Sequence, residues 1–226
     1  VEAKLKLSAT KDGMLKALEC IYWVDCGAYS DTGPHMAKAL AVDCTGPYNI
    51  PNVHCDAFTV YTNHNYVTSF RGYGHSAFTF CIERSLDKLA NILKMDPLEL
   101  RYKNAISPGH TSPTQVEISL SNTGDLRKCI SKLKEYINWN EGPIVKQENG
   151  IIRAKGVSCL WKTSDSPTDA SSGAILTFTS DGCINLNCSA VEIGPGMKTT
   201  LAQILAEKMK MSVDDIYVVI DVNTQT

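Results

Sequence analysis

The sequence lacks the paired cysteines of a metal-binding motif, although cysteine itself is abundant. No two of its nine cysteines form a CxxC pair, so neither a zinc ribbon nor the ligand set of an iron–sulfur cluster is present. Unpaired cysteines in an odd number are typical of reduced, mostly buried thiols in a cytoplasmic protein. They are Cys20, Cys26, Cys44, Cys55, Cys81, Cys129, Cys159, Cys183 and Cys188.

The sequence also lacks an excess of either charge and any long apolar run. With 22 basic and 24 acidic residues, the net charge is -2, which offers no electrostatic surface for nucleic acid or for an anionic membrane. No apolar run approaches membrane-spanning length, and we expect no signal peptide. We therefore expect a cytoplasmic protein whose partner is a small molecule or another protein.

The hydrophobic pattern predicts an α+β protein with mixed sheets and packed helices. A chain of 226 residues, 43% of them hydrophobic, can bury a core and form one large or two modest domains. The polar stretch 140–150 is the best candidate boundary, which divides the chain into 1–145 and 146–226. The sequence shows no internal repeat. Strands are predicted on both sides of the turn at 11–13 and at 52–63, 151–161, 173–180, 183–192 and 215–222, and helices at 33–44, 76–93, 95–105, 123–139 and 198–211.

Both ends of the sequence read as strands. The chain opens on "VEAKLKLSA" and stops directly after "YVVIDV". Strands at the edge of a sheet expose unpaired backbone groups and favour pairing with another chain or segment. We therefore expect a piece of a larger polypeptide, with a possible homo-oligomer.

One short stretch, "FRGYGHSAFTF" at 70–80, has the composition of a ligand-binding turn. Gly72 and Gly74 flank Tyr73 just before a predicted helix. Glycine reaches backbone conformations closed to other residues and lets a ligand approach the main chain. Two glycines in three positions are more than a simple connection requires.

A second glycine turn, "EIGPGMKTT" at 192–200, leads from a strand into a helix. Unpaired amides in the first helical turn, together with the helix dipole, favour an anion or a cofactor. By itself this is more often a tight connection. Its spacing matches neither the Rossmann fingerprint nor the phosphate-binding loop.

Taken together, these segments resemble a known family. The stretches "GAYSDTGPHMAKALAVDCTGPYNIPNV", "TSFRGYGHSAFTFCIERSLDKLANILKMDPLELRYKNA" and "GVSCLW…SAVEIGPGMKTTLAQILAEKM" look like the molybdenum-binding region of the xanthine dehydrogenase and aldehyde oxidase family. The resemblance covers nearly the whole chain, in the family's order. It implies a large subunit or domain that holds molybdenum on a pterin dithiolene (molybdopterin) and oxidises aromatic heterocycles or aldehydes with oxygen derived from water.

The resemblance implies roles for residues of the first turn. Arg71 matches the position whose main-chain amide lies beside the molybdenum, and Gly72 allows the close approach. Tyr73 matches the aromatic residue that stacks on a flat substrate ring. His75 replaces a smaller residue of many relatives, and it bonds the substrate, faces solvent or packs.

The later segments carry two further implied sites. Leu160 falls near a second substrate-wall position, with Cys159 and Trp161 as alternatives one residue away. The turn from Gly194 to Gly196 matches the contact to the pterin. At its centre the family usually has glutamine, whose carboxamide can donate to the cofactor, whereas Pro195 has no donor at all.

The family's catalytic glutamate base is expected downstream of this chain, so no catalytic residue is assigned within it. Glu192 precedes a turn, and Glu83 and Glu99 fall in predicted helices, where a solvated position is expected. Iron–sulfur clusters and FAD are implied for other domains or subunits. The chain is thus predicted to belong to an oxidoreductase that hydroxylates a purine or related N-heterocycle.

Two other functions remain open at this point. A noncatalytic scaffold of the same fold that has lost the metal would suit Pro195 and the missing base. A stand-alone nucleotide- or anion-binding module would use the turn at 192–200.

Overall fold

The computed structural model describes residues 1–226 except 121, 147–148, 164–170 and 221–226. The chain forms two compact units, Val1–Thr163 and Ser164–Thr226. The division at residue 146 inferred from the sequence stays a prediction about the cofactor-binding regions. In the structure, residues 146–163 belong to the first unit.

The first unit is built on a mixed three-stranded sheet with the strand order β1-β2-β3. Strands β1 (Glu2–Ala9) and β2 (Leu15–Asp25) pair antiparallel, and β3 (Asn52–Val60) pairs parallel to β2. The predicted turn between the first two strands is confirmed, with Gly13 at a φ of 86°. The parallel pair needs a crossover, which contains a helix.

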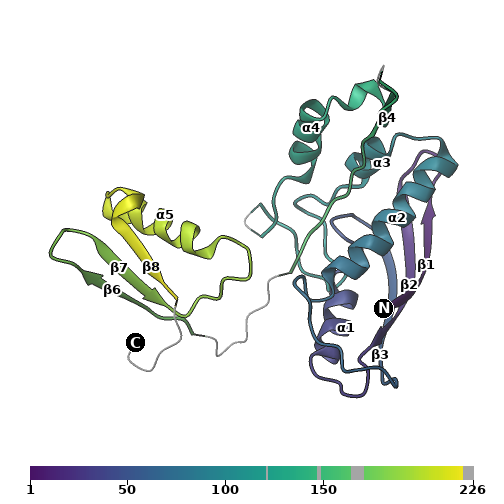
Figure 1. The fold of residues 1–226 in the computed structure, drawn as a ribbon. Coiled ribbons are helices and arrows are strands. Elements are labelled where there is room, and N and C mark those ends of the chain that lie inside the picture. Colours follow the sequence, from purple (N-terminus) through teal and green to yellow (C-terminus); the bar gives the residue numbers. More distant parts are fainter. Residues whose placement is uncertain (121, 147–148, 164–170, 221–226) are drawn as a thin grey trace. The chain divides into compact units, whose positions relative to one another are not determined.

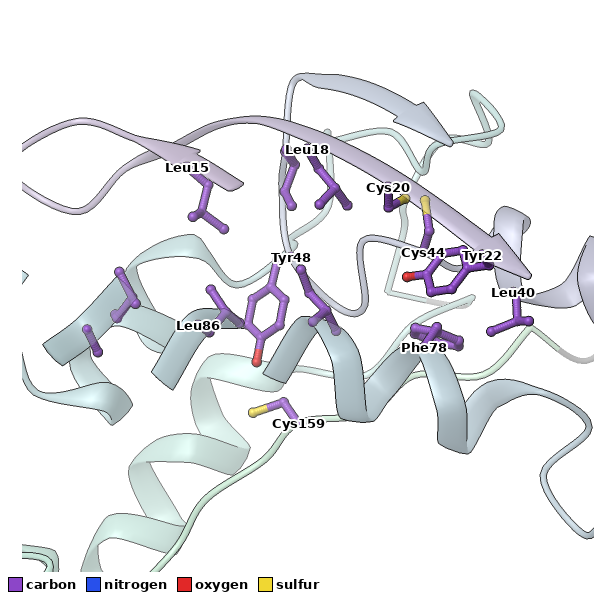
Figure 2. Close-up of a cluster of buried hydrophobic side chains, with 14 of the residues drawn as sticks. Leu15, Leu18, Cys20, Tyr22, Leu40, Cys44, Tyr48, Phe78, Leu86 and Cys159 are labelled. Atoms are coloured by element: carbon purple, nitrogen blue, oxygen red, sulfur yellow. The ribbon is translucent and has the colours of Figure 1, made fainter. Parts of the chain in front are cut away.

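Helices cover one face of this sheet (Figure 1). Apolar residues of the helices, such as Phe78, Ile82 and Leu86 of α2, pack with Leu18 and Tyr22 of β2 in one core. Figure 2 shows part of this core. Helix α2 follows a helical spacing of buried positions, as the sequence predicts. The helices of this unit are α1 (Gly33–Val42), α2 (His75–Leu93), α3 (Pro97–Asn104), α4 (Leu126–Tyr136) and the 3-10 turn η1 (Trp139–Glu141).

Helix α3 begins where local sequence chemistry predicts. The Asp96 side chain accepts hydrogen bonds from the N–H groups of Leu98 and Glu99, and Pro97 occupies the first turn. The second carboxylate oxygen of Asp96 accepts a hydrogen bond from Trp139 Nε1 at 2.7 Å. One aspartate therefore begins α3 and also fixes the buried Trp139.

The strand predicted at 151–161 is wrong beyond its first residues. Only β5 (Ile152–Ala154) forms, paired antiparallel with β4 (Ile144–Lys146). Farther along, Cys159 is buried and Leu160 is exposed. This alternation arises because one side of the segment packs on the core of the first unit, without a strand partner.

The second unit has the same topology as the sheet of the first. Its sheet order is β6-β7-β8, with the first pair antiparallel, the second parallel, and a helix between β7 and β8. This structural repeat was not evident in the sequence. The elements are β6 (Ala174–Phe178), β7 (Ile184–Cys188), α5 (Met197–Met209), the 3-10 turn η2 (Val213–Asp215) and β8 (Ile216–Val219).

The predicted α+β class with mixed sheets and packed helices is confirmed. The end of the last predicted strand, at 221–222, lies outside the described residues. Among the helices that the structure describes, none combines the length and the apolarity needed to cross a membrane.

Candidate functional site

The turn at 70–74 has an unusual backbone. Gly72, Tyr73 and Gly74 have φ values of 112°, 51° and 87°, three consecutive residues in the left-handed region. Tyr73 is not a glycine, so its conformation costs free energy and persists only where the surroundings impose it. A Cβ added to Gly72 would lie 2.7 Å from Ser76 Oγ. The prediction that this turn needs glycine for its backbone conformation is confirmed at Gly72 and Gly74.

The buried side chain of His75 contacts the backbone of this turn. Its side chain is buried, its Nδ1 lies 2.8 Å from the carbonyl oxygen of Gly72, and its Nε2 lies 2.7 Å from Oδ2 of Asp43. Both ring nitrogens therefore lie within hydrogen-bond distance of an oxygen of the chain, and the tautomer decides which of them donates. Of the roles left open for His75 in the sequence, the structure shows packing: the side chain is buried, and both ring nitrogens contact groups of the chain.

Asp43 joins the turn to the segment that contains Leu160. Its carboxylate accepts from the backbone N–H of Thr163 at 3.0 Å and from Thr163 Oγ1 at 2.6 Å. Its backbone carbonyl accepts from Trp161 Nε1 at 3.3 Å. Together with His75, these contacts satisfy a buried carboxylate with three donors. Sequence reasoning missed Asp43, because no local pattern relates it to residues 32 and 120 positions away.

The predicted site residues of the first unit divide into outward and inward groups. Arg71 and Leu160 are exposed, the latter to 61%. Tyr73 is half-buried and packs against the core, as does Trp161, and Cys159 is buried. Of the three candidates at 159–161, Leu160 is therefore the most exposed, Trp161 is half-buried and Cys159 is buried.

The turn at 194–196 belongs to the second unit and has its own internal acceptor. Gly194 and Gly196 have φ values of 99° and 78°, with the exposed Pro195 between them. The carboxylate of Glu192 accepts from the N–H groups of Gly194 at 2.7 Å, Gly196 at 3.2 Å and Met197 at 2.7 Å. The expectation of unpaired amides in the first turn of α5 (Met197–Met209) is therefore wrong for Met197, and the two glycine amides before the helix are paired as well.

Electrostatics at the second turn favour the ionised carboxylate. Partial desolvation raises the pKa of Glu192, but the backbone N–H groups that it accepts from outweigh this effect and leave the pKa lowered. A negative charge from the chain itself therefore lies at the start of α5. This arrangement weakens the case for a free nucleotide or anion at the same amides.

Glu83 and Glu99 were both expected at solvated helix positions, and only one of them lies there. Glu99 is exposed, as expected for a solvated helix position. Glu83 is buried: its carboxylate accepts from Arg101 Nε at 2.8 Å and from the Tyr48 hydroxyl. The expectation of a solvated Glu83 is therefore wrong, because α3 packs over this part of α2 and brings Arg101 to it.

The chemistry around the first turn fits a cofactor that supplies its own metal ligands. Among the described residues, the only group of histidine, cysteine or acidic side chains with metal-binding spacing is Cys20, Cys44 and Cys55, none of which is in the turn. What the turn offers is main chain beside two glycines. Such a surface suits close approach by a bound group.

Comparison with known proteins gives consistent matches. The family model of the molybdopterin cofactor-binding domain matches residues 1–105, and a second model of the same description matches residues 132–226. The chain is 44% identical over 198 residues to an aldehyde oxidoreductase of Megalodesulfovibrio gigas, covering 86% of this chain and 21% of that protein. It is 30% identical to a subunit of a probable xanthine dehydrogenase of Bacillus subtilis, covering 96% of this chain and 29% of that protein.

Solved structures agree with this result. The aldehyde oxidoreductase from Desulfovibrio gigas superposes with a TM-score of 0.72 at 29% identity, over 96% of this chain and 24% of that one. The chain thus spans less than a third of the length of these relatives. It belongs to the xanthine dehydrogenase and aldehyde oxidoreductase family, as part of that family's molybdopterin-binding region.

Proposed function

We propose that the intact protein is a molybdenum hydroxylase that oxidises a purine or a related N-heterocycle with oxygen derived from water. The cofactor-binding domain matches support the cofactor. The names of similar proteins include xanthine dehydrogenases and, at 40% identity over 58% of this chain, a nicotinate dehydrogenase large molybdopterin subunit of Eubacterium barkeri. An aldehyde is the competing substrate class, since an aldehyde oxidoreductase is also similar.

The observation that carries the proposal is the turn at 70–74. Three successive residues have left-handed backbone. The buried His75 contacts the carbonyl oxygen of Gly72 and is itself held by the buried Asp43. Strained backbone of this kind persists where the surroundings over-determine it and is concentrated at ligand sites. In our proposal the backbone of Arg71 and Gly72 lies against the molybdenum cofactor, which supplies the redox chemistry and the activated oxygen when bound.

Substrate contacts are proposed for two side chains of the first unit. The ring of Tyr73 offers an aromatic face for stacking on a flat heterocycle, and its hydroxyl can orient the substrate. Leu160 forms an apolar wall, which its outward side chain supports. The segment that carries Leu160 is held to the turn through Asp43.

The second turn is proposed to contact the pterin through Gly194, Pro195 and Gly196. A Cβ added at Gly196 would meet nothing within 4 Å, so space exists for a bound group on that side. Glu192 organises the turn through the three amides that it binds. Contacts to the cofactor at Pro195 come from main chain carbonyl or apolar surface, because proline has no N–H.

The remaining chemistry is assigned to other parts of the intact protein. We propose that the glutamate base lies outside this chain, and that iron–sulfur clusters and FAD in other domains or subunits carry the electrons away. The protein works in the cytoplasm in this proposal. A scaffold that has lost the metal is the alternative, and metal content of the intact protein decides between them.

The test uses Tyr73→Ala and Tyr73→Phe in the intact enzyme, with the exposed Tyr66→Ala as the matched control. We expect Tyr73→Ala to lower kcat/KM for hypoxanthine and nicotinate about tenfold, because stacking contributes roughly 0.5–1.5 kcal/mol beyond buried area. Tyr73→Phe should lose much less. Gly72→Val should lower the molybdenum content itself.

Each part of this proposal has a result that would contradict it. Equal activity per bound molybdenum in wild type and Tyr73→Ala would remove the stacking role. Turnover of benzaldehyde with no turnover of any N-heterocycle would assign the aldehyde class instead. An intact wild-type protein without molybdenum would support the scaffold.

A further inference from the structure

Three cysteines that are distant in the sequence, none of them in the turn at 70–74, meet in the first unit. The sulfur atoms of Cys20, Cys44 and Cys55 all lie within 4.8 Å of one another. Cys20 and Cys44 are buried, and Cys55 is half-buried. Sequence analysis excluded paired-cysteine motifs and gave no sign of this cluster, because each cysteine comes from a different segment.

The fold explains why the three sulfurs converge. Cys20 on β2 and Cys55 on β3 are register partners in the parallel pair, so their side chains leave the sheet on the same face. Helix α1 crosses that face and ends at Val42, and Cys44 follows two residues later. Figure 2 shows the side chains of Cys20 and Cys44 directed toward each other from the strand and from the chain that follows α1.

A second observation at the same place is an unsatisfied polar group. The hydroxyl of Tyr22 is fully buried and has no hydrogen-bond partner, one of only two such side-chain atoms among the described residues. A buried O–H without an acceptor is costly. It would gain an acceptor if a neighbouring thiol became a thiolate.

We propose that Cys20, Cys44 and Cys55 form a three-thiolate site for one soft metal ion, of which Cu(I) is the class best suited. Thiolates select Cu(I) and zinc, but structural zinc takes four protein ligands, and no fourth ligand side chain joins this group among the described residues. Three sulfurs at about 2.3 Å from a central ion lie about 4 Å apart in a trigonal plane. The observed spacing requires only small shifts to reach this geometry.

The exposure of the three cysteines shows how the ion would enter, and their thiols supply the protons that are released on binding. Cys55 is the partly exposed member and gives access to the two buried sulfurs. Each thiol loses its proton to solvent when the ion binds, and Tyr22 donates to the resulting thiolate cluster. The site uses no residue assigned to the molybdenum cofactor or the substrate, so it stands whether or not the proposed hydroxylase function holds.

The experiment is an anaerobic titration of the reduced full chain with Cu(I) against a chromogenic Cu(I) chelator. We expect one Cu(I) per chain, with three sulfur neighbours by X-ray absorption. Cys44→Ala and Cys55→Ala should each weaken binding by more than the ~10–100-fold typical of losing an outer-shell partner. Cys81→Ala, a half-buried cysteine outside the cluster, is the control and should bind as wild type does.

A labelling measurement keeps the proposal testable if the variants fold poorly. In the wild-type chain, Cu(I) should protect Cys55 from iodoacetamide, read by peptide mass spectrometry, and leave the exposed Cys129 reactive. The proposal is overturned if the chain does not compete with the chelator for Cu(I), or if fewer than three sulfurs coordinate the ion. It is also overturned if Cu(I) leaves the labelling of Cys55 as unchanged as that of Cys129.

Discussion

Removing the carboxylate of Asp43 should be among the most damaging single changes in the first unit. Asp43→Ala removes the carboxylate oxygen that His75 Nε2 contacts and leaves two donors of Thr163 unpaired. Side-chain exposure is only 6% for His75 and 3% for Asp43, so water cannot replace the lost partner. A buried donor left without its acceptor costs about 1–3 kcal/mol, so the loss of these contacts together should cost roughly 3–5 kcal/mol.

A second Asp–His pair provides the control. His54 Nε2 lies 3.3 Å from Asp56 Oδ2, but those side chains are 69% and 45% exposed. Exposed pairs contribute only about 0–1 kcal/mol. Asp56→Ala should therefore change stability little, although it removes the same chemical contact as Asp43→Ala.

The assay is urea unfolding of the full chain followed by tryptophan fluorescence. Trp23, Trp139 and Trp161 all lie in the first unit, so the signal reports that unit alone. Urea unfolding measures this loss directly as a change in the free energy of unfolding. In thermal unfolding, the same 3–5 kcal/mol would lower the Tm by roughly 6–20 °C for a unit of this size. If Asp43→Ala costs no more than Asp56→Ala, the reasoning that the buried pair holds the turn is refuted.

Three further predictions concern other contacts. Glu83→Ala should destabilise the first unit by about 1–3 kcal/mol, because it leaves Arg101 Nε and the Tyr48 hydroxyl without their buried acceptor, although Asp87 still pairs with Arg101. Arg84→Ala, at an exposed pair, should cost less than about 1 kcal/mol, and urea unfolding measures both. Gly72→Ala should cost about 1–3 kcal/mol through its φ of 112°, whereas Gly124→Ala, with open space and no positive φ, should stay within about 0.5 kcal/mol. A threonine hydroxyl, a backbone N–H and a histidine lower the pKa of Asp25 to about 2, so its stabilisation is present above about pH 4 and lost as the pH falls toward 2. The stability difference between wild type and Asp25→Asn should accordingly shrink over that range in acid unfolding, and a constant difference would contradict it.

Much of the local structure could be predicted because its causes are local. Asp96 followed by Pro97 determines the start of α3, since the capping side chain and the amides that it binds are neighbours in the chain. The spacing of apolar residues determined α2, and the paired glycines marked both turns at positions where the backbone does take positive φ. The resemblance of those turns to a family likewise depends on residue order alone.

The strand predicted at 151–161 shows where local pattern misleads. Alternating burial is real at 159–161, but it comes from packing on the core and not from pairing with a strand. Glu192 is a second example. Its position suggested only a residue before a turn, yet its carboxylate occupies the amides that the sequence left open.

The sequence by itself therefore determined the α+β class, the course of most helices and strands, and the family. Only the tertiary structure decided which buried groups are partners: Asp43 with His75 and Thr163, Glu83 with Arg101, and the three sulfurs of Cys20, Cys44 and Cys55. The physical reason is distance along the chain. Helical periodicity, caps and turns act over a few residues, whereas desolvated charges and thiols are paired by the packing of helices on a sheet.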